Sequence, residues 1–241
     1  MKILIVRHAE PDYSIDSLTP KGRVEAELLS QKLIKADINE FYVSVLGRAK
    51  DTAEYTLKKV GKAPHICEWL KEFPSIIDRP DRDNMIVWDW LPEDWTRVDE
   101  FYSNTEWHNV DTLKKGKVFE EYSRVTAEFD KVLKKHGYER NGRYYNAVNA
   151  NEDTIAFFCH FGVECVLLSH LLNISPMQLW HGTCALPSSV TTLVTEERRK
   201  GIALFRMTSF GDLSHLYAGN EEPSFAARFC ETFDNTEQRH D

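Results

Sequence analysis

The feature that most constrains the fold of this chain is a unit that occurs three times: a short apolar strand, a polar junction and a helix. The strands are rich in Ile, Val and Phe and do not alternate with polar residues, which is typical of strands buried on both faces of a sheet. They are expected at Lys2 to Val6, Phe41 to Leu46 and Thr154 to Cys159. The repetition predicts an α/β fold: a three-layer sandwich with a mostly parallel central sheet flanked by helices, plus an inserted cap segment.

The segments between and after these strands carry ordinary helix and turn signals. Thr19 supplies a capping hydroxyl and Pro20 a first helical residue, so a helix is expected from about Pro20. Apolar residues at helical spacing predict further helices after Arg48, after Gly162 and over residues 117–136. Two late strands, SVTTLVTEE and GIALFRMTSF, predict a hairpin that completes the sheet.

Between Pro74 and Lys117 the chain becomes rich in Trp, Asp and Pro and loses clean periodicity. A length of 241 residues is within the range of one α/β domain with an insertion. We therefore expect a single domain over residues 1–241, with residues 74–117 as an inserted cap region that covers the site. Trp88, Trp90 and Trp95 either line a substrate pocket or pack an irregular insert, and the composition somewhat favours packing.

Charge and cysteine content narrow the classes of partner and compartment. The formal net charge is -8 at pH 7, which argues against non-specific binding to nucleic acid or to an anionic membrane surface. The 5 cysteines form no CxxC pair and no metal-ligand spacing, so we expect neither a disulfide framework nor a zinc site. The first apolar run stops at Arg7, too early for a signal peptide, so a cytoplasmic location is expected. Apolar residues in the tail PSFAARFCETF are compatible with packing on the domain or on a second subunit, so a homodimer is one expectation.

Polar side chains follow each of the three predicted strands at the point where the strand ends. They are Arg7 and His8, Arg48, and His160. Because functional groups of open α/β sheets collect at the carboxyl ends of parallel strands, we expect these four side chains to converge. Each of them alone is more often a surface or core residue, and only the joint pattern indicates a site.

The motifs around these residues resemble those of the histidine phosphatase superfamily, in its phosphoglycerate mutase-like branch. The matching segments, in the order of the family, are Arg7-His8-Ala9-Glu10, Leu18-Thr19, Arg48-Ala49-x-x-Thr52-Ala53, Leu70-Lys71-Glu72 and His160-Phe161-Gly162. The resemblance covers roughly residues 1 to 72 and 150 to 207. Ala9 and Phe161 stand where the family has glycine, and these departures bear on the shape of the substrate pocket.

The resemblance implies a phosphohistidine chemistry that agrees with the properties of the residues. A neutral imidazole attacks phosphorus when its other nitrogen is held as a donor, which makes His8 the expected nucleophile. Forked guanidinium donors suit the phosphoryl oxygens, so Arg7 and Arg48 are expected to bind phosphate, with His160 as a third donor, protonated by the surrounding anion. Tyr13 and Phe161 are expected to line the substrate pocket.

A carboxyl group with a raised pKa is needed to protonate the leaving oxygen. Glu72, between apolar neighbours, is the expected acid, while Glu68 in the same stretch is the alternative. Glu10 is expected to be a structural partner of the arginines. No metal and no cofactor are expected.

The expected function is that of a metal-independent phosphomonoesterase that hydrolyses a small phosphorylated metabolite. A phosphoglycerate mutase is the alternative among enzymes, although Glu72 is followed by Phe73-Pro74-Ser75 and not by the Arg-Tyr-Gly-like continuation of mutases. A catalytically silent phosphate-binding module is the alternative of a different class. Such a module has no need of both histidines, both arginines and a carboxylic acid.

Overall fold

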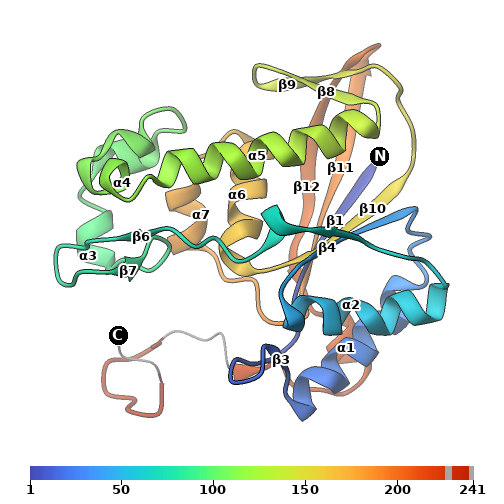
Figure 1. The fold of residues 1–241 in the computed structure, drawn as a ribbon, viewed down its shortest axis with the longest axis horizontal. Helices are drawn as coiled ribbons and strands as arrows, with labels where there is room; N and C mark the ends of the chain where they lie inside the picture. Colours follow the sequence, from blue (N-terminus) through green and yellow to red (C-terminus); the bar gives the residue numbers. More distant parts are fainter. Residues whose placement is uncertain (226–229, 239–241) are drawn as a thin grey trace.

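The structure, a computed structural model, describes residues 1–225 and 230–238 (Figure 1). Its centre is an eight-stranded sheet with the order β5-β4-β10-β1-β11-β12-β9-β8. In that order the strands are His65–Cys67, Glu40–Ser44, Thr154–Cys159, Lys2–Arg7, Val190–Arg199, Ile202–Asp212, Tyr144–Ala147 and Tyr138–Asn141. The pairs β1/β10, β10/β4 and β4/β5 are parallel, and only β11 and β9 run against the common direction. This confirms the predicted α/β class with a mostly parallel sheet.

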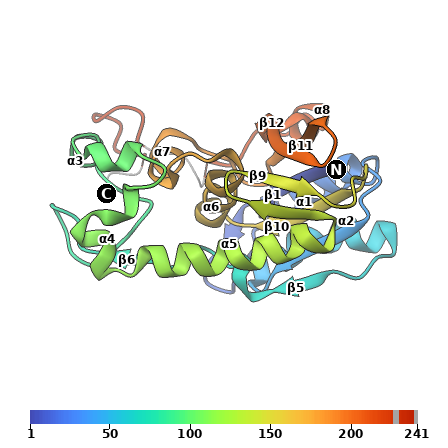
Figure 2. The ribbon, with the colours of Figure 1, turned by 90° about the horizontal axis from the view of Figure 1, so that it is seen from above.

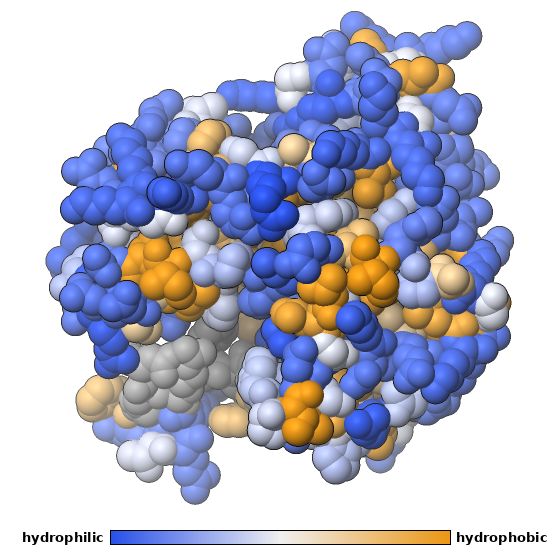
Figure 3. All heavy atoms as spheres, in the orientation of Figure 1, coloured by the Kyte–Doolittle hydropathy of each residue, from blue (hydrophilic) through white to orange (hydrophobic). Residues whose placement is uncertain are grey.

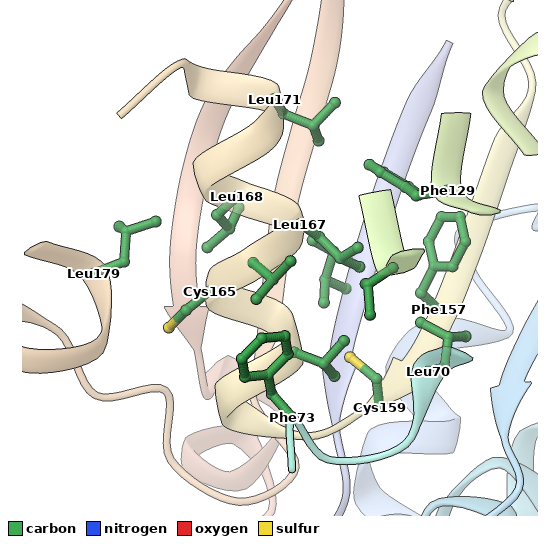
Figure 4. Close-up of a cluster of buried hydrophobic side chains, with 14 of the residues drawn as sticks. Leu70, Phe73, Phe129, Phe157, Cys159, Cys165, Leu167, Leu168, Leu171 and Leu179 are labelled. Atoms are coloured by element: carbon green, nitrogen blue, oxygen red, sulfur yellow. The ribbon is translucent and has the colours of Figure 1, made fainter. Parts of the chain in front are cut away.

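Alternate residues of β1 point to two different helical layers, because successive side chains of a strand lie on opposite faces. Leu4 and Val6 belong to a buried cluster with Leu29 of α1 (Pro20–Leu33) and Ala53 of α2 (Gly47–Val60). Ile3 and Ile5 belong to a second cluster, shared with α5 (Val118–Lys135) and α6 (Phe161–Leu172). Figure 4 shows part of it, with Leu167 and Leu171 of α6 near Phe129 and Phe157. The sandwich therefore has one helical layer on each face.

The helices begin and end where the chain supplies local signals. The Thr19 hydroxyl accepts a hydrogen bond from the Gly22 amide at 3.0 Å, with Pro20 as the first helical residue of α1. Helix α2 ends at Gly61, whose φ of 65° is the left-handed conformation that glycine adopts without steric cost. The hairpin β11–β12 and the long helix α5 confirm the corresponding predictions.

The segment 74–117 consists of short elements gathered at one end of the molecule (Figures 1 and 2). They are the hairpin β6 (Ile76–Ile77) and β7 (Met85–Ile86), helices α3 (Pro92–Trp95) and α4 (Asp111–Lys115), and 3-10 turns at Asp99–Tyr102 and Trp107–Asn109. Trp90, Phe101 and Trp107 are buried here and belong to the same core cluster as the sheet residues. Packing thus accounts for part of the tryptophan content of this segment.

Several features differ from the sequence predictions or were not predicted. The second strand ends at Ser44 and not at Leu46, because Leu46 already has the N-cap position of α2. The hairpin β8–β9 and the strand β5 extend the sheet beyond the predicted strands. Additional short elements are β2 (Pro11–Asp12), β3 (Ser17–Leu18), α7 (Pro176–Gly182) and α8 (Ser214–Ala218).

The surface and the cysteines of the described ranges bear on membrane insertion and on disulfide formation. No helix there has the length and apolar character needed to cross a bilayer, and the face in Figure 3 is mostly hydrophilic with isolated apolar patches. Cys67, Cys159 and Cys165 are buried free thiols. The tail over residues 223–233, expected to pack on the domain or a second subunit, falls partly outside the description at residues 226–229; its Ser224 hydroxyl donates a hydrogen bond to the Glu10 carboxylate.

Candidate active site

The carboxyl ends of β1 and β10 bring the two predicted histidines together. The strands pair in parallel with Arg7 opposite Cys159, so His8 and His160 follow at the same sheet edge. Their ring centroids are 5.0 Å apart, and both side chains are buried. The predicted convergence of these strand ends is therefore present in the fold.

His8 has one ring nitrogen fixed by the backbone. Its Nδ1 lies 2.8 Å from the carbonyl oxygen of Ala9, which can only accept, so Nδ1 carries the proton and donates it. Burial, followed by the charge of Arg7, lowers the pKa of His8 well below its ordinary value, and the Ala9 carbonyl acts in the opposite direction. The ring is therefore neutral near pH 7, with an electron pair on Nε2.

Arg7 lies beside this ring with donors to spare. One Nη1 hydrogen bond goes to the carbonyl of Ala185, while Nε is buried and makes no hydrogen bond to the described residues. The guanidinium lies over the ring of Phe161, 5.7 Å from its centroid. A buried cation with unused N–H groups is suited to an anionic ligand.

Arg48 approaches from the start of α2, and a neighbouring loop orients it. Its Nη1 donates to a carboxylate oxygen of Asp16 at 2.7 Å, and the second oxygen of Asp16 accepts from the Gly47 amide at 2.6 Å. A Cβ atom at Gly47 would lie 2.0 Å from the Asp16 carbonyl oxygen, so only glycine fits this close approach. The Tyr13 ring packs on the guanidinium, 5.4 Å from its centroid, and 68% of Tyr13 is exposed.

His160 is held by a residue that the sequence analysis did not single out. Its Nε2 lies 2.9 Å from the Ser44 hydroxyl at the end of β4, while its buried Nδ1 has no hydrogen-bond partner among the described residues. Burial, and then the nearby His8 and Arg48, lower the pKa of His160 well below its ordinary value. Protonation of His160 therefore needs the opposing charge of a bound anion.

Glu72 and Glu68 have different surroundings. One oxygen of Glu72, Oε1, accepts from the amides of Phe73 at 2.8 Å and Val163 at 3.2 Å, which places the carboxyl at the start of α6, the helix that follows His160. Burial raises the pKa of Glu72, against the lowering effect of these hydrogen bonds and of Arg7 and Arg48. Glu68 is exposed and pairs with Lys71 at 2.8 Å. Of the two candidate acids, only Glu72 lies among the other site residues.

Glu10 was expected to be a partner of the arginines, and this is wrong. Its carboxylate accepts hydrogen bonds from the hydroxyls of Thr19, at 2.7 Å, and Ser224. These hydrogen bonds place the Glu10 side chain beside the start of α1 and Ser224. Within the ranges that the structure describes, no group of three or more His, Cys, Asp or Glu side chains is arranged to hold a metal ion.

Comparison with known proteins places this geometry in a family. The model of the histidine phosphatase superfamily, branch 1, matches residues 3–208. A Schizosaccharomyces pombe protein described as a probable phosphatase is 24% identical over 233 residues, which cover 90% of this chain and 95% of that protein.

Two solved structures illustrate the similarity of fold. A mutant of phosphoserine phosphatase from Entamoeba histolytica, in complex with phosphoserine, has a TM-score of 0.59 at 19% identity, covering 89% of this chain and 98% of that chain. A mycobacterial glucosyl-3-phosphoglycerate phosphatase with inorganic phosphate has a TM-score of 0.55 at 19% identity, covering 89% and 98%. With a family model that spans most of its length and the same fold in these structures, the chain belongs to the histidine phosphatase superfamily, branch 1.

Proposed function

We propose that this protein is a metal-independent phosphomonoesterase that hydrolyses a small-molecule phosphate through a phosphohistidine on His8. The observation that carries the proposal is the fixed tautomer of His8: Nδ1 donates to Ala9, so the electron pair is on Nε2, beside Arg7. Phosphatases among the related proteins and structures support hydrolysis as the reaction class.

In the first step, Nε2 of His8 attacks phosphorus and the bond from phosphorus to the leaving oxygen breaks. Arg7, Arg48 and His160 stabilise the charge on the phosphoryl oxygens, and Glu72 gives its proton to the leaving oxygen. In the second step, water attacks the phosphohistidine and Glu72 takes a proton from that water. The bond between phosphorus and Nε2 then breaks, and inorganic phosphate leaves.

The first test compares EDTA-treated wild type with His8→Ala on p-nitrophenyl phosphate and a panel of phosphorylated metabolites, following phosphate release. We expect turnover in the wild type and a loss of about 10³-fold or more in the variant, since the nucleophile is removed. His65→Ala, a change at a histidine with 52% of its side chain exposed, is the matched control and should keep its activity.

Other outcomes would contradict the proposal. Isomerisation of 3-phosphoglycerate in the presence of a bisphosphate primer, without phosphate release from any substrate, would assign a mutase. Binding of inorganic phosphate without turnover in either assay would assign a binding module.

A second experiment tests the intermediate itself. Alkaline quenching of the wild type during turnover should trap an acid-labile phosphoryl group that His8→Ala does not form.

A further inference from the structure

Strand β4 ends beside the second histidine of the site and brings a buried hydroxyl group to it. In the parallel pair of β4 and β10, Val43 lies opposite Phe158, so Ser44 and His160 follow at the same sheet edge. Both side chains are 0% exposed, and the Ser44 hydroxyl lies 2.9 Å from Nε2 of His160. This distance permits a hydrogen bond in either direction, and the direction decides which nitrogen of His160 carries a proton.

A second contact of the Ser44 hydroxyl indicates the direction. The Leu46 amide, which can only donate, lies 3.3 Å from Ser44 Oγ. A serine hydroxyl has two lone pairs and one proton to donate, and a buried proton without an acceptor is costly. Within the described residues, Nε2 of His160 is the acceptor in reach of that proton. Ser44 therefore donates to Nε2, and Nε2 is the nitrogen that carries no proton.

The proton of a neutral His160 is then on the other nitrogen, Nδ1. A neutral imidazole has one donor and one acceptor nitrogen. Nδ1 of His160 is buried and makes no hydrogen bond to the described residues. The ring lies next to the proposed nucleophile, since the centroids of His8 and His160 are 5.0 Å apart. A buried, unused N–H group at this place is suited to a phosphoryl oxygen.

The two other protonation states of His160 fit these surroundings less well. In the imidazolium, and also in the Nε2–H tautomer, Nε2 carries a proton. Ser44 would then have to accept from Nε2, and its own proton would lose its acceptor. Positive charge is disfavoured further, because burial, followed by His8, Arg48 and Arg7, lowers the pKa of this imidazole well below its ordinary value.

We propose that Ser44 is a positioning residue that holds His160 as the neutral Nδ1–H tautomer, and that His160 binds the phosphoryl group by donating from Nδ1. A neutral donor thus takes the place of the protonated one expected from the sequence. The two histidines then have the same tautomer and opposite roles: His8 presents the lone pair of Nε2 to phosphorus, whereas His160 presents a proton to a phosphoryl oxygen. The inference rests on the proposed function and assigns the donor atom at the same site.

The direct test is nitrogen NMR of protein with isotope-labelled histidine, in long-range proton–nitrogen correlation spectra at neutral pH, with and without inorganic phosphate. The signals of His160 are those missing from His160→Asn. We expect one protonated and one unprotonated nitrogen, in the pattern of the Nδ1–H tautomer, in both samples. The Nε2–H pattern, or two protonated nitrogens once phosphate is added, would overturn the inference. Ser44→Ala should lose the single-tautomer pattern, because Nε2 no longer has its donor.

Two neutral replacements of His160 test which atom donates. Asparagine places its amide nitrogen near the position of Nδ1, whereas glutamine places its own near the position of Nε2. On p-nitrophenyl phosphate we expect kcat/KM of His160→Asn to exceed that of His160→Gln by about 10-fold, the equivalent of about 1.4 kcal/mol. Equal losses in the two variants, the result expected if His160 supplies a positive charge, would contradict the inference.

Variants of serine separate positioning from folding. Ser44→Ala should lower kcat/KM by about 10-fold, and Ser44→Thr, which restores the hydroxyl, should recover both the rate and the tautomer. The matched control is Ser30→Ala, since the buried Ser30 hydroxyl also donates, to the Glu27 carbonyl at 2.6 Å, and accepts, from Lys59 at 2.7 Å. This control should keep the wild-type rate and the His160 spectrum.

The outcomes separate the inference from the proposed function. An unchanged His160 tautomer in Ser44→Ala would overturn the role of Ser44 while hydrolysis that depends on His8 stands. Absence of phosphate release by the wild type from every substrate would instead overturn the proposed function, and the NMR spectra, which need no turnover, would still report the tautomer of His160.

Discussion

Two buried groups of the site have pKa values displaced in opposite directions, and both displacements suit the proposed first step. His8 must be neutral to attack. Burial and the charge of Arg7 lower its pKa, so the imidazole stays neutral at pH values below the ordinary pKa of histidine. Glu72 must be protonated to act as the acid. Burial raises its pKa, so the protonated form persists at pH values above the ordinary pKa of glutamate. Activity should therefore rise with pH as His8 loses its proton and fall as Glu72 loses its own.

Glu72→Gln tests the role of this carboxyl. For an alkyl phosphate we expect kcat to fall by about 10²–10⁴-fold, with a smaller loss for p-nitrophenyl phosphate, whose leaving oxygen needs less help from an acid. The fall of kcat on the alkaline side of the pH profile should disappear, because the group that titrates there is gone. The control is Glu68→Gln, an exposed position, which should keep the wild-type profile. The assignment is wrong if the two variants behave the other way round.

At the scale of elements, the start of α6 is where three parts of the site meet. The helix follows β10 directly after His160, and its Val163 amide donates to Glu72 from the first turn. Gly162 leaves the space that the Glu72 carboxyl and the Trp88 indole occupy. The helix start thus positions the proposed acid near the strand end that carries the second histidine.

Gly162→Ala should therefore impair catalysis more than folding. The new methyl group would be 2.6 Å from Oε1 of Glu72, a carboxyl that two amides hold in place, so the carboxyl must move. A displacement of about 1 Å is expected to lower kcat by about 10²-fold. Gly182→Ala in α7 is the matched control, since nothing lies within 4 Å of its added Cβ. Equal kcat in the two variants, with circular dichroism of the wild type, would argue against this positioning.

At the scale of the whole molecule, the stability of the fold depends on pH through carboxyl groups that become buried on folding. Glu164 is 1% exposed, accepts from the Thr191 hydroxyl at 2.6 Å, and has its pKa raised by burial to about 7. In the unfolded chain this group loses its proton near its ordinary value of 4.5. Between these pH values the native state binds more protons than the unfolded state, so stability falls as pH rises.

Glu164→Gln should remove this contribution while its amide oxygen can still accept from Thr191. We expect the free energy of unfolding, measured by urea denaturation, to match that of the wild type near pH 4.5. At pH 8 it should exceed the wild-type value by up to about 3 kcal/mol. Glu120→Gln, at an exposed position of α5, is the control for the removal of one carboxyl group. A constant difference for Glu164→Gln would contradict the raised pKa.

Local signals accounted for the elements that could be predicted. The apolar runs of β1 and β10, the Thr19-Pro20 start of α1 and the amphipathic face of α5 each lie within a few consecutive turns or strand residues. The hairpin β8–β9 also carries a local signal, because Gly142, with a φ of 60°, takes the first position of the two-residue turn between Asn141 and Tyr144.

What the sequence by itself determined is therefore the α/β class, the family and the set of polar residues that follow the strands. What only the tertiary structure decided is which partner each of them has: Ser44 for His160, Asp16 for Arg48, and Thr19 with Ser224 for Glu10. The tertiary structure also decided which of the two candidate acids lies at the site, because Glu72 is placed among the other site residues and Glu68 is exposed. The physical reason is that strand and helix patterns depend on neighbours along the chain, whereas hydrogen-bond partners, burial and pKa depend on distant segments that meet only when the chain folds.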